Sequence, residues 1–298
     1  MALKPTNMSY SRFFSFALFV SSFFAIAQQP ATSGETVKKA LEQKQAITKS
    51  SLVKNVPFKN IGPTIMSGRV VDLDVNPNMP SEFYVGYASG GVWHTTNNGT
   101  TFTPILDSSD TQNVGDIAVH WPTRTIYVGT GENNASRSSY AGIGILKSTD
   151  NGKSWTNLGL MDAHHFAPIL IHPDNPDVVV VGSTGHLYSA NEERGVYKTT
   201  DGGKTWKQTL FVDNMSGIID LQHSPSNYNV MFATSWTKDR KAWNFTGNGN
   251  NSGIYKSTDA GETWIKVSTE KSGFPTGKGV GRIGVAVFND NIVYAIHD

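Results

Sequence analysis

The sequence carries acidic, amide, basic and aromatic side chains in segments that have the composition of loops. Aromatic rings stack on the apolar faces of sugars, and amide, guanidinium and carboxylate groups bond hydroxyls or carboxylates. Together these residue types suit a glycan or an anionic peptide as the ligand. The candidate ligand-binding residues are Arg69, Asn133, Asn134, Arg137, Tyr140, Trp236, Arg240, Trp243 and Arg282.

Two acidic residues, Glu132 and Asp116, are candidates for a catalytic acid and base pair. Hydrolysis of a glycosidic bond needs two carboxyl groups that flank it. Each residue also has a structural alternative. Asp116 can pair with Arg69 between neighbouring elements, and Glu132 can accept bonds that fix its own loop. The sequence leaves these interpretations open, because it does not fix the separation of the two carboxyl groups.

The elements that position these residues follow from an internal repeat. One unit of twelve residues occurs four times, and its central glycines at 99, 152, 203 and 261 are separated by 53, 51 and 58 residues. A propeller blade of four strands needs about 40–50 residues of chain. The four units are Gly91–Phe102, Gly144–Trp155, Gly195–Trp206 and Gly253–Trp264.

The chemistry of the repeated unit predicts a β-hairpin. Its Asp or Asn side chain can bond nearby backbone amides, and its Gly supplies the positive φ that other residues rarely adopt. The Trp or Phe that closes the unit is expected to bury its ring between neighbouring sheets. The repeat is therefore a folding element and not a catalytic one.

Apolar segments before each unit predict the remaining strands, so that each blade has strands A to D with the repeated hairpin between C and D. The predicted fold class is an all-β propeller of four-stranded blades. It is expected to occupy residues 56–298 as four blades and half of a fifth, and to continue beyond the chain. The inner strands A are expected at residues 70–75, 116–119, 168–171, 217–221 and 282–287.

This topology sorts side chains between two faces. The D–A and B–C connections lie on one face, and the A–B and C–D turns lie on the other. Ligand sites are expected on the first face, because its B–C segments 130–142, 183–194 and 235–252 are long. His120, His172 and His223 end their inner strands and are expected to be structural turn residues. No metal site and no cofactor is predicted.

Residues 1–27 have the pattern of a signal peptide, since basic residues precede a short apolar stretch that ends at Ala27. A membrane anchor is the alternative, but the stretch falls short of the roughly 20 residues of a spanning helix. No membrane span is expected after cleavage. Residues 28–55 are predicted to form a polar linker with at most a short helix near residues 35–45.

Composition narrows the class of protein further. The 298 residues include no cysteine, which fits a bacterial periplasmic or secreted protein without disulfides. The formal net charge is +1, and no run of Lys or Arg is present. A nucleic-acid partner is not expected, because such proteins need a basic surface that neutralises phosphates.

The repeated unit resembles the Asp box, or bacterial neuraminidase repeat, of sialidases, family seventy-four glycoside hydrolases and sortilin-type receptors. The strings Ile61-Gly62-Pro63, Ser89-Gly90-Gly91-Val92-Trp93 and Gly129-Thr130-Gly131-Glu132-Asn133-Asn134 resemble a bacterial group labelled glycosyl hydrolase or sortilin-like. The resemblance covers residues 58–298. It implies a propeller that either acts on carbohydrate or binds a peptide or protein ligand.

The catalytic positions of those enzyme families differ in this chain. The family seventy-four xyloglucanases carry a catalytic Asp in a string Tyr-x-x-x-Asp-x-Gly-Gly, where this chain has Ala88. The Arg-Ile-Pro motif of sialidases is not found. Two hypotheses remain: an exported carbohydrate-active propeller that binds glycan at the B–C and D–A loop face, and a non-catalytic sortilin-like propeller that binds peptide or protein.

Overall fold

The computed structural model describes residues 30–56 and 68–298. The predicted signal peptide and the string Ile61-Gly62-Pro63 lie outside the described residues. Contacts divide the chain into Met1–Thr32 and Ser33–Asp298, and the second unit contains all of the strands.

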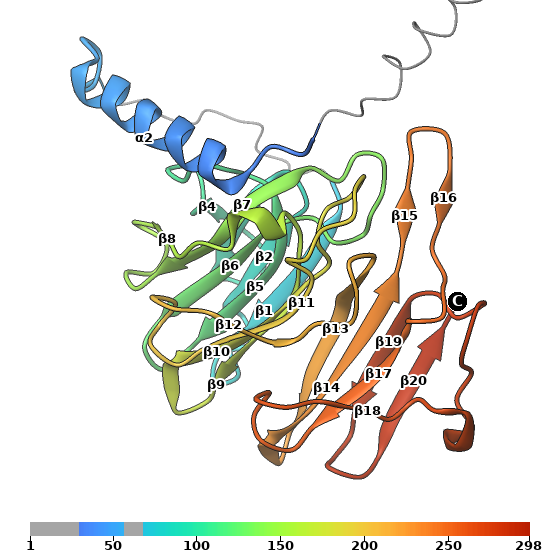
Figure 1. The fold of residues 1–298 in the computed structure, drawn as a ribbon. Coiled ribbons are helices and arrows are strands. Elements are labelled where there is room, and N and C mark those ends of the chain that lie inside the picture. Colours follow the sequence, from blue (N-terminus) through green and yellow to red (C-terminus); the bar gives the residue numbers. More distant parts are fainter. Residues whose placement is uncertain (1–29, 57–67) are drawn as a thin grey trace, which may run out of the picture. The chain divides into compact units, whose positions relative to one another are not determined.

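In the described residues the strands form four antiparallel sheets of four strands, a fifth blade sheet of two strands, and a separate two-stranded hairpin (Figure 1). This arrangement confirms the all-β fold class and the four-stranded blades expected from the repeat. The first two sheets are β1 (Val70–Val75), β2 (Phe83–Tyr87), β3 (Gly91–Thr95) and β4 (Thr103–Pro104), then β5 (Val114–His120), β6 (Thr125–Gly131), β7 (Ala141–Ser148) and β8 (Thr156–Asn157).

The third and fourth sheets have the same strand order as the first two, with one added hairpin. The third contains β9 (Phe166–His172), β10 (Asn175–Ser183), β11 (Gly195–Thr199) and β12 (Lys207–Leu210). The fourth contains β13 (Ser216–Ser224), β14 (Asn227–Thr237), β17 (Gly253–Ser257) and β18 (Ile265–Lys266). The hairpin of β15 (Asp239–Arg240) and β16 (Phe245–Thr246) lies between β14 and β17 in the chain, and the fifth sheet is β19 (Ile283–Val287) with β20 (Val293–His297).

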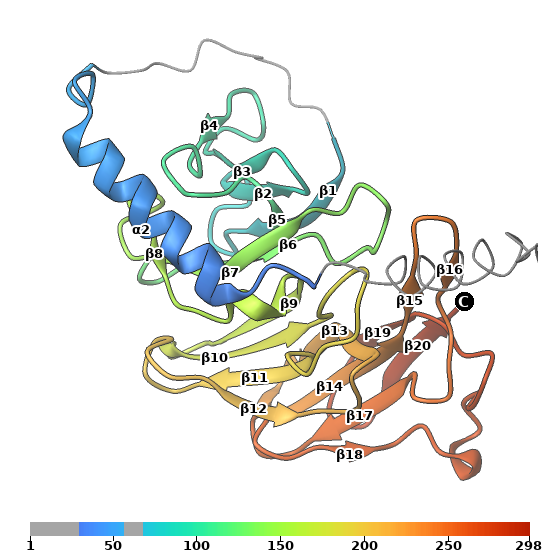
Figure 2. The ribbon, with the colours of Figure 1, turned by 45° about the horizontal axis from the view of Figure 1, so that its top comes forward.

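The apolar core lies between consecutive sheets. Successive inner strands are neighbours, and the sheets stand side by side in both views (Figure 1 and Figure 2). Each large cluster of buried apolar side chains draws on two adjacent sheets, as with Tyr84 of β2 and Ile117 of β5. Both faces of the second sheet pack on a neighbouring sheet, so its strands β5 and β6 are buried along their whole length.

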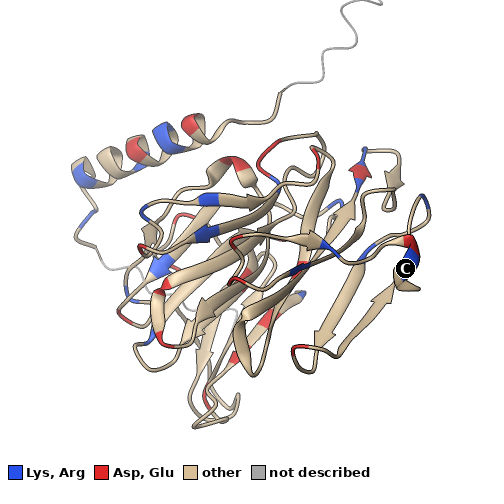
Figure 3. Ribbon diagram, turned by 60° about the horizontal axis from the view of Figure 1, so that its bottom comes forward, with Lys and Arg blue, Asp and Glu red and all other residues tan. Residues whose placement is uncertain are grey.

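The segment predicted as a linker contains a helix, α2 (Gly34–Ser50), which is longer than the short helix expected. The Ser33 side chain caps it by accepting a hydrogen bond from the Thr36 amide at 3.3 Å. Most of its residues are exposed, and both charge signs alternate along it (Figure 3). The Gly34 amide donates to Asp162 of the 3₁₀ turn η1 (Met161–Ala163) at 2.6 Å. No helix in the described ranges is long and apolar enough to span a membrane.

The repeated hairpins lie on the face opposite to the long loops, as expected. In the third repeat, the Gly202 amide donates to the carbonyl oxygen of Asp177, which lies near the start of β10, just after the β9–β10 turn. The fourth repeat makes the equivalent bond from Ala260 to Asn229, at the β13–β14 turn. The C–D hairpins and the A–B turns therefore share one face of the blades.

Hydrogen bonds within each hairpin explain its sequence. In the third repeat, Asp201 accepts the Thr205 amide at 2.9 Å and the Thr205 hydroxyl at 2.6 Å, while Thr199 accepts the Gly203 amide at 2.9 Å. These bonds hold the pKa of Asp201 below its usual range, the bonds from Thr205 contributing most. The turn ends on Gly203, whose φ of +90° few other residues adopt.

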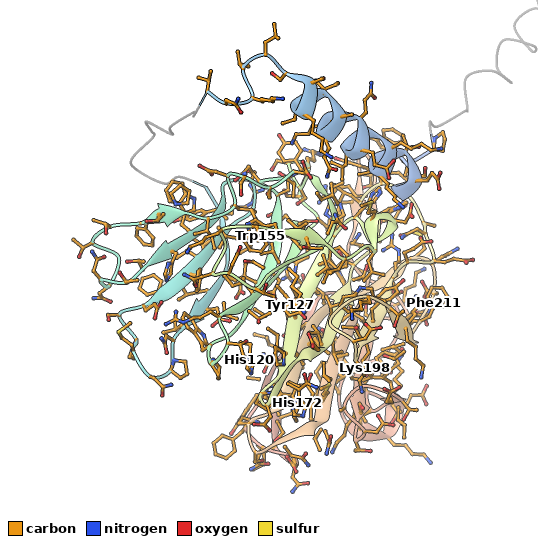
Figure 4. The ribbon with its side chains drawn as sticks, turned by 90° about the vertical axis from the view of Figure 1, so that its left-hand side faces the viewer. His120, Tyr127, Trp155, His172, Lys198 and Phe211 are labelled. Carbon is orange, nitrogen blue, oxygen red and sulfur yellow. The ribbon has the colours of Figure 1, made fainter. Side chains whose placement is uncertain are left out.

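The closing Trp of a hairpin contacts the preceding blade, which confirms its expected position between sheets. The Trp155 indole donates to the carbonyl oxygen of Ile105 at 2.9 Å, and Trp206 donates to that of Leu158 at 3.1 Å. Figure 4 shows Trp155 among the side chains of the blades. Each hairpin thus closes its own sheet and joins it to its neighbour.

Replacing Gly203 by Ala tests this packing role. A Cβ at Gly203 would lie 2.4 Å from Leu158 Cδ1, whereas a Cβ at Gly159, which has a nearly identical φ of +89°, meets nothing within 4 Å. Both substitutions strain the backbone, but only Gly203→Ala also overpacks the contact between blades. We expect Gly203→Ala to lose at least about 1 kcal/mol more unfolding free energy than Gly159→Ala in urea titrations. Equal losses would contradict the role of the hairpin turn in joining the blades.

Candidate functional site

The B–C loop of the second blade is held by a chain of side-chain hydrogen bonds. Arg69, which precedes β1, donates from Nε to Glu132 Oε1 and from Nη2 to Glu132 Oε2, both at 2.6 Å. Asn134 donates to Glu132 Oε1 at 3.1 Å and accepts from Arg282 Nη1 at 2.8 Å. Because Arg282 precedes β19, this network links the first, second and fifth sheets. It brings together four of the residues that the sequence placed on one face.

The network makes Glu132 an ionised, fully bonded carboxylate. Its side chain is 1% exposed and also accepts the Ser139 hydroxyl at 2.9 Å. Burial alone would raise the pKa of Glu132, but the hydrogen bonds from Arg69, Asn134 and Ser139 outweigh burial and lower it. This geometry is that of a residue that fixes its loop, which was one of the two roles open from the sequence. The predicted pairing of Arg69 with Asp116 is wrong, because the guanidinium binds Glu132 instead.

A cavity of about 360 Å³ opens where the inner strands begin. Its size falls in the range of small-molecule sites. The polar groups that line it are Asp72, Asp116, Asn133, Asn134, Asp220 and Arg282, and the remaining lining residues come from β1, β9, β13 and β19. Four of these polar residues were candidates from the sequence. The cavity therefore lies on the D–A and B–C face.

Asn133 is the polar residue of the cavity lining whose side chain makes no hydrogen bond to another described residue. It is only 9% exposed, and its amide makes no hydrogen bond to any described residue. The polar atoms of Asn133 are not among the fully buried side-chain atoms without a partner, so they are open to the cavity and can bond a ligand there.

The three carboxylates of the cavity occupy equivalent positions of the repeat. The strand registers align the following residues of the five inner strands: Asp72, Asp116, Pro168, Asp220 and Gly284. Where this residue is Asp, its Oδ2 accepts a backbone amide of the next inner strand. These bonds run from Ile117 to Asp72 at 3.1 Å, from Ile169 to Asp116 at 2.8 Å and from Val285 to Asp220 at 2.8 Å.

Crowding of these carboxylates changes their acidity. Burial raises the pKa of Asp116 well above its usual range, and the nearby charge of Asp72 raises it further. Burial likewise raises the pKa of Asp72 and of Asp220, although backbone amides partly offset the effect. Burial and neighbouring charge therefore favour the protonated form of Asp116, in contrast to Glu132.

Trp236 is buried, which corrects the expectation that it faces a ligand. It is 4% exposed, donates from its indole to the Gly247 carbonyl at 2.7 Å, and packs with Ala135, Leu187 and Ile219. The charged residues that follow it in the sequence suggested exposure. The strand β14 extends as far as Thr237, however, so that Trp236 points into a small core between the loops.

Four other candidates lie outside the cavity lining. Tyr140 and Trp243 are 58% and 82% exposed, and Arg137 is also exposed. Trp243 lies between β15 and β16, and the guanidinium of Arg240 lies 3.9 Å from the ring centroid of Phe245. Arg137, Tyr140 and Trp243 thus form exposed surface on the loops, whereas Arg240 is half-buried.

The histidines that end the inner strands bond neighbouring turns. His120 shares hydrogen bonds with the Thr123 hydroxyl at 2.8 Å and with the Pro173 carbonyl of the next blade at 2.9 Å. His120 and His172 lie toward the same end of their blades (Figure 4). Among the described residues, no three His, Asp or Glu side chains are arranged to hold a metal ion.

Asp72 and Asp220 were missed as site residues by the sequence analysis. The sequence does contain a signal for them, because Asp72, Asp116 and Asp220 each lie within an apolar inner strand, at or next to its middle. The equivalence of the three positions can be recognised only from the strand registers, because the number of residues between successive blades is unequal.

The four-stranded sheets and the repeated hairpins give the chain the fold of an Asp-box β-propeller, and comparisons with known proteins are consistent with a propeller of the glycosyl hydrolase and sortilin-like type. The model of the Sortilin-Vps10 family, described as sortilin, neurotensin receptor 3, matches residues 143–279.

Curated and solved proteins show the same relationship. Xyloglucanase Xgh74A of Acetivibrio thermocellus is 28% identical over 260 residues, which covers 71% of this chain and 27% of that protein. An ancestral GH74 enzyme of known structure is 18% identical with a TM-score of 0.54, covering 75% of this chain and 28% of that one. The chain thus spans about a quarter of the length of these relatives.

The raised pKa of Asp116 predicts how stability changes with pH. The folded state binds this proton more tightly than the unfolded chain, so unfolding releases protons and stability falls as pH rises above about 4. The loss continues until the pH exceeds the folded-state pKa, and Asp74, with a pKa raised by burial to about 6, contributes in the same direction. Asp116→Asn keeps an acceptor for the Ile169 amide but cannot ionise. We expect this variant to be more stable relative to wild type at pH 8 than at pH 4.

Urea unfolding at several pH values measures this difference. Asp174→Asn is the matched control, since Asp174 is an exposed carboxylate in the β9–β10 turn of the opposite face. Parallel stability profiles for wild type and Asp116→Asn would show that Asp116 has an ordinary pKa.

Proposed function

We propose that the chain is an exported, carbohydrate-active propeller that binds a glycan at the cavity on its D–A and B–C face. The observation that carries the proposal is the cavity lined by Asp116, Asn133, Asn134 and Arg282. The Asn133 amide, the carboxylates and the guanidinium are groups that bond sugar hydroxyls. Exposed Tyr140 and Trp243 on the adjoining loops offer rings on which further sugar units can stack.

The similarity to a xyloglucanase supports a carbohydrate as the class of ligand, at the level of the family. Ala88 stands where the resembled enzymes have an acid, so a hydrolytic activity requires other carboxyl groups. Asp116 is the proposed proton donor, because burial and neighbouring charge favour its protonated form. Glu132 is the proposed partner carboxylate from the sequence; its hydrogen bonds keep it ionised, and it would have to exchange some of them for the substrate because it lies outside the cavity lining.

Glycan-array binding followed by calorimetry tests the binding function. Asn133→Ala removes a side chain that makes no internal hydrogen bond, so a loss of affinity reports on contact with the ligand rather than on folding. We expect a loss of about tenfold, the value of one good hydrogen bond to a bound sugar. Asp174→Asn on the opposite face should leave affinity unchanged. Failure to bind any glycan, or preferential capture of peptides from a peptide library, would favour the sortilin-like alternative.

Reducing-sugar assays on plant and bacterial polysaccharides test hydrolysis separately. The double variant Glu132→Gln, Asp116→Asn is expected to abolish any product formation while the chain still melts cooperatively. Hydrolysis that persists in this variant would remove both residues from the proposed catalytic pair.

A further inference from the structure

The cavity contains more negative than positive charge. Asp72, Asp116 and Asp220 line it from β1, β5 and β13, and Arg282 is the cation among the lining residues. Arg282 donates to Asn134 rather than to any of the three carboxylates, although its charge acts on Asp220. The fold thus gathers three acids around one hollow with a single cation to balance them.

The cavity also presents acceptors that lack donors. Asp116 accepts one backbone amide through Oδ2, which leaves Oδ1 for another partner. Asn133 is free of internal hydrogen bonds. A ligand that fills the cavity must therefore bring N–H or O–H donors, and one that brings positive charge relieves the repulsion among the carboxylates.

A primary ammonium group matches this arrangement. It carries three N–H donors and one positive charge. Bonds between ammonium and carboxylate groups are about twice as strong as neutral ones. In the described part of the chain no three acidic side chains are arranged to hold a metal ion, so we expect the ammonium to bond one or two of these carboxylates while its sugar ring occupies the rest of the cavity.

We propose that the cavity binds the free amino group of an amino sugar within a glycan. The inference rests on the proposed glycan-binding function and specifies its substrate class. The amino group lies among Asp72, Asp116 and Asp220, and Asn133 bonds a hydroxyl of the same unit. The exposed ring of Tyr140, in the same loop as Asn133, favours a sugar over an extended lysine side chain as the carrier of the amine.

Three tetrasaccharides with the same β-1,4 backbone provide the test. They are the tetramers of glucosamine, N-acetylglucosamine and glucose, compared by isothermal titration calorimetry with the full chain at pH 6 and low salt. We expect the glucosamine tetramer to bind about tenfold more tightly than the other two, as one charge-assisted contact provides. Equal affinity for the three would overturn the amino-sugar inference and leave the glycan-binding function standing. Binding of none of them, together with an empty glycan array, would overturn both.

Variants locate the effect. Asp116→Asn and Asp72→Asn each remove one charge and retain an acceptor for the backbone amide of the next strand. Each should reduce the preference for the glucosamine tetramer over the glucose tetramer about tenfold. Asp174→Asn removes an equal charge from the opposite face and should have no effect. Unchanged preference in both cavity variants, with normal melting, would place the amine elsewhere.

Two competing ligands complete the test. The competitors are calcium chloride and a pentalysine peptide. If either binds more tightly than the glucosamine tetramer and displaces it, the cavity serves a divalent cation or a basic peptide instead. Either result would overturn the amino-sugar inference.

Discussion

The hydrogen bond from the backbone of one inner strand to a carboxylate of the preceding strand is the interaction on which the site depends. Inner strands of neighbouring blades are not paired as in one sheet, so their backbone amides need partners from another source. Asp72, Asp116 and Asp220 supply those partners at three of the blade junctions. The same bonds fix the three acidic side chains in the lining of one cavity.

The two faces of the propeller divide structure from function. The Asp-box hairpins bond the A–B turns and, through Trp155 and Trp206, the preceding blades. That stabilisation leaves the opposite face free to carry long loops. The loop after β6 uses this freedom, because Glu132 and Asn134 connect it to Arg69 on one side and to Arg282 on the other. A loop held at both sides keeps Asn133 in the cavity wall without any bond of its own.

The fold could be predicted from the sequence because each repeat contains the residues that form its own hairpin turn. An Asp, a Gly with positive φ and a closing Trp define one turn, and four copies with similar spacing define the blades. The same reasoning assigned Asp116, Asn133, Asn134 and Arg282 to one face, where they line a single cavity. Sequence reasoning failed where tertiary contacts decide. The burial of Trp236 depends on three separate loops, the partner of Arg69 is Glu132, and the equivalence of Asp72 and Asp220 with Asp116 needs the strand registers.

A carboxyl-carbon NMR titration, with the Asp116 resonance assigned from the Asp116→Asn variant, tests the central claim most directly. Asp116 is buried near other carboxylates, so the midpoint of its titration should lie well above the ordinary aspartate pKa of about 3.9. Addition of the glucosamine tetramer should lower that midpoint, because a bound cation favours the ionised form. Titration of Asp116 near the ordinary value would contradict the crowding of carboxylates at the channel mouth.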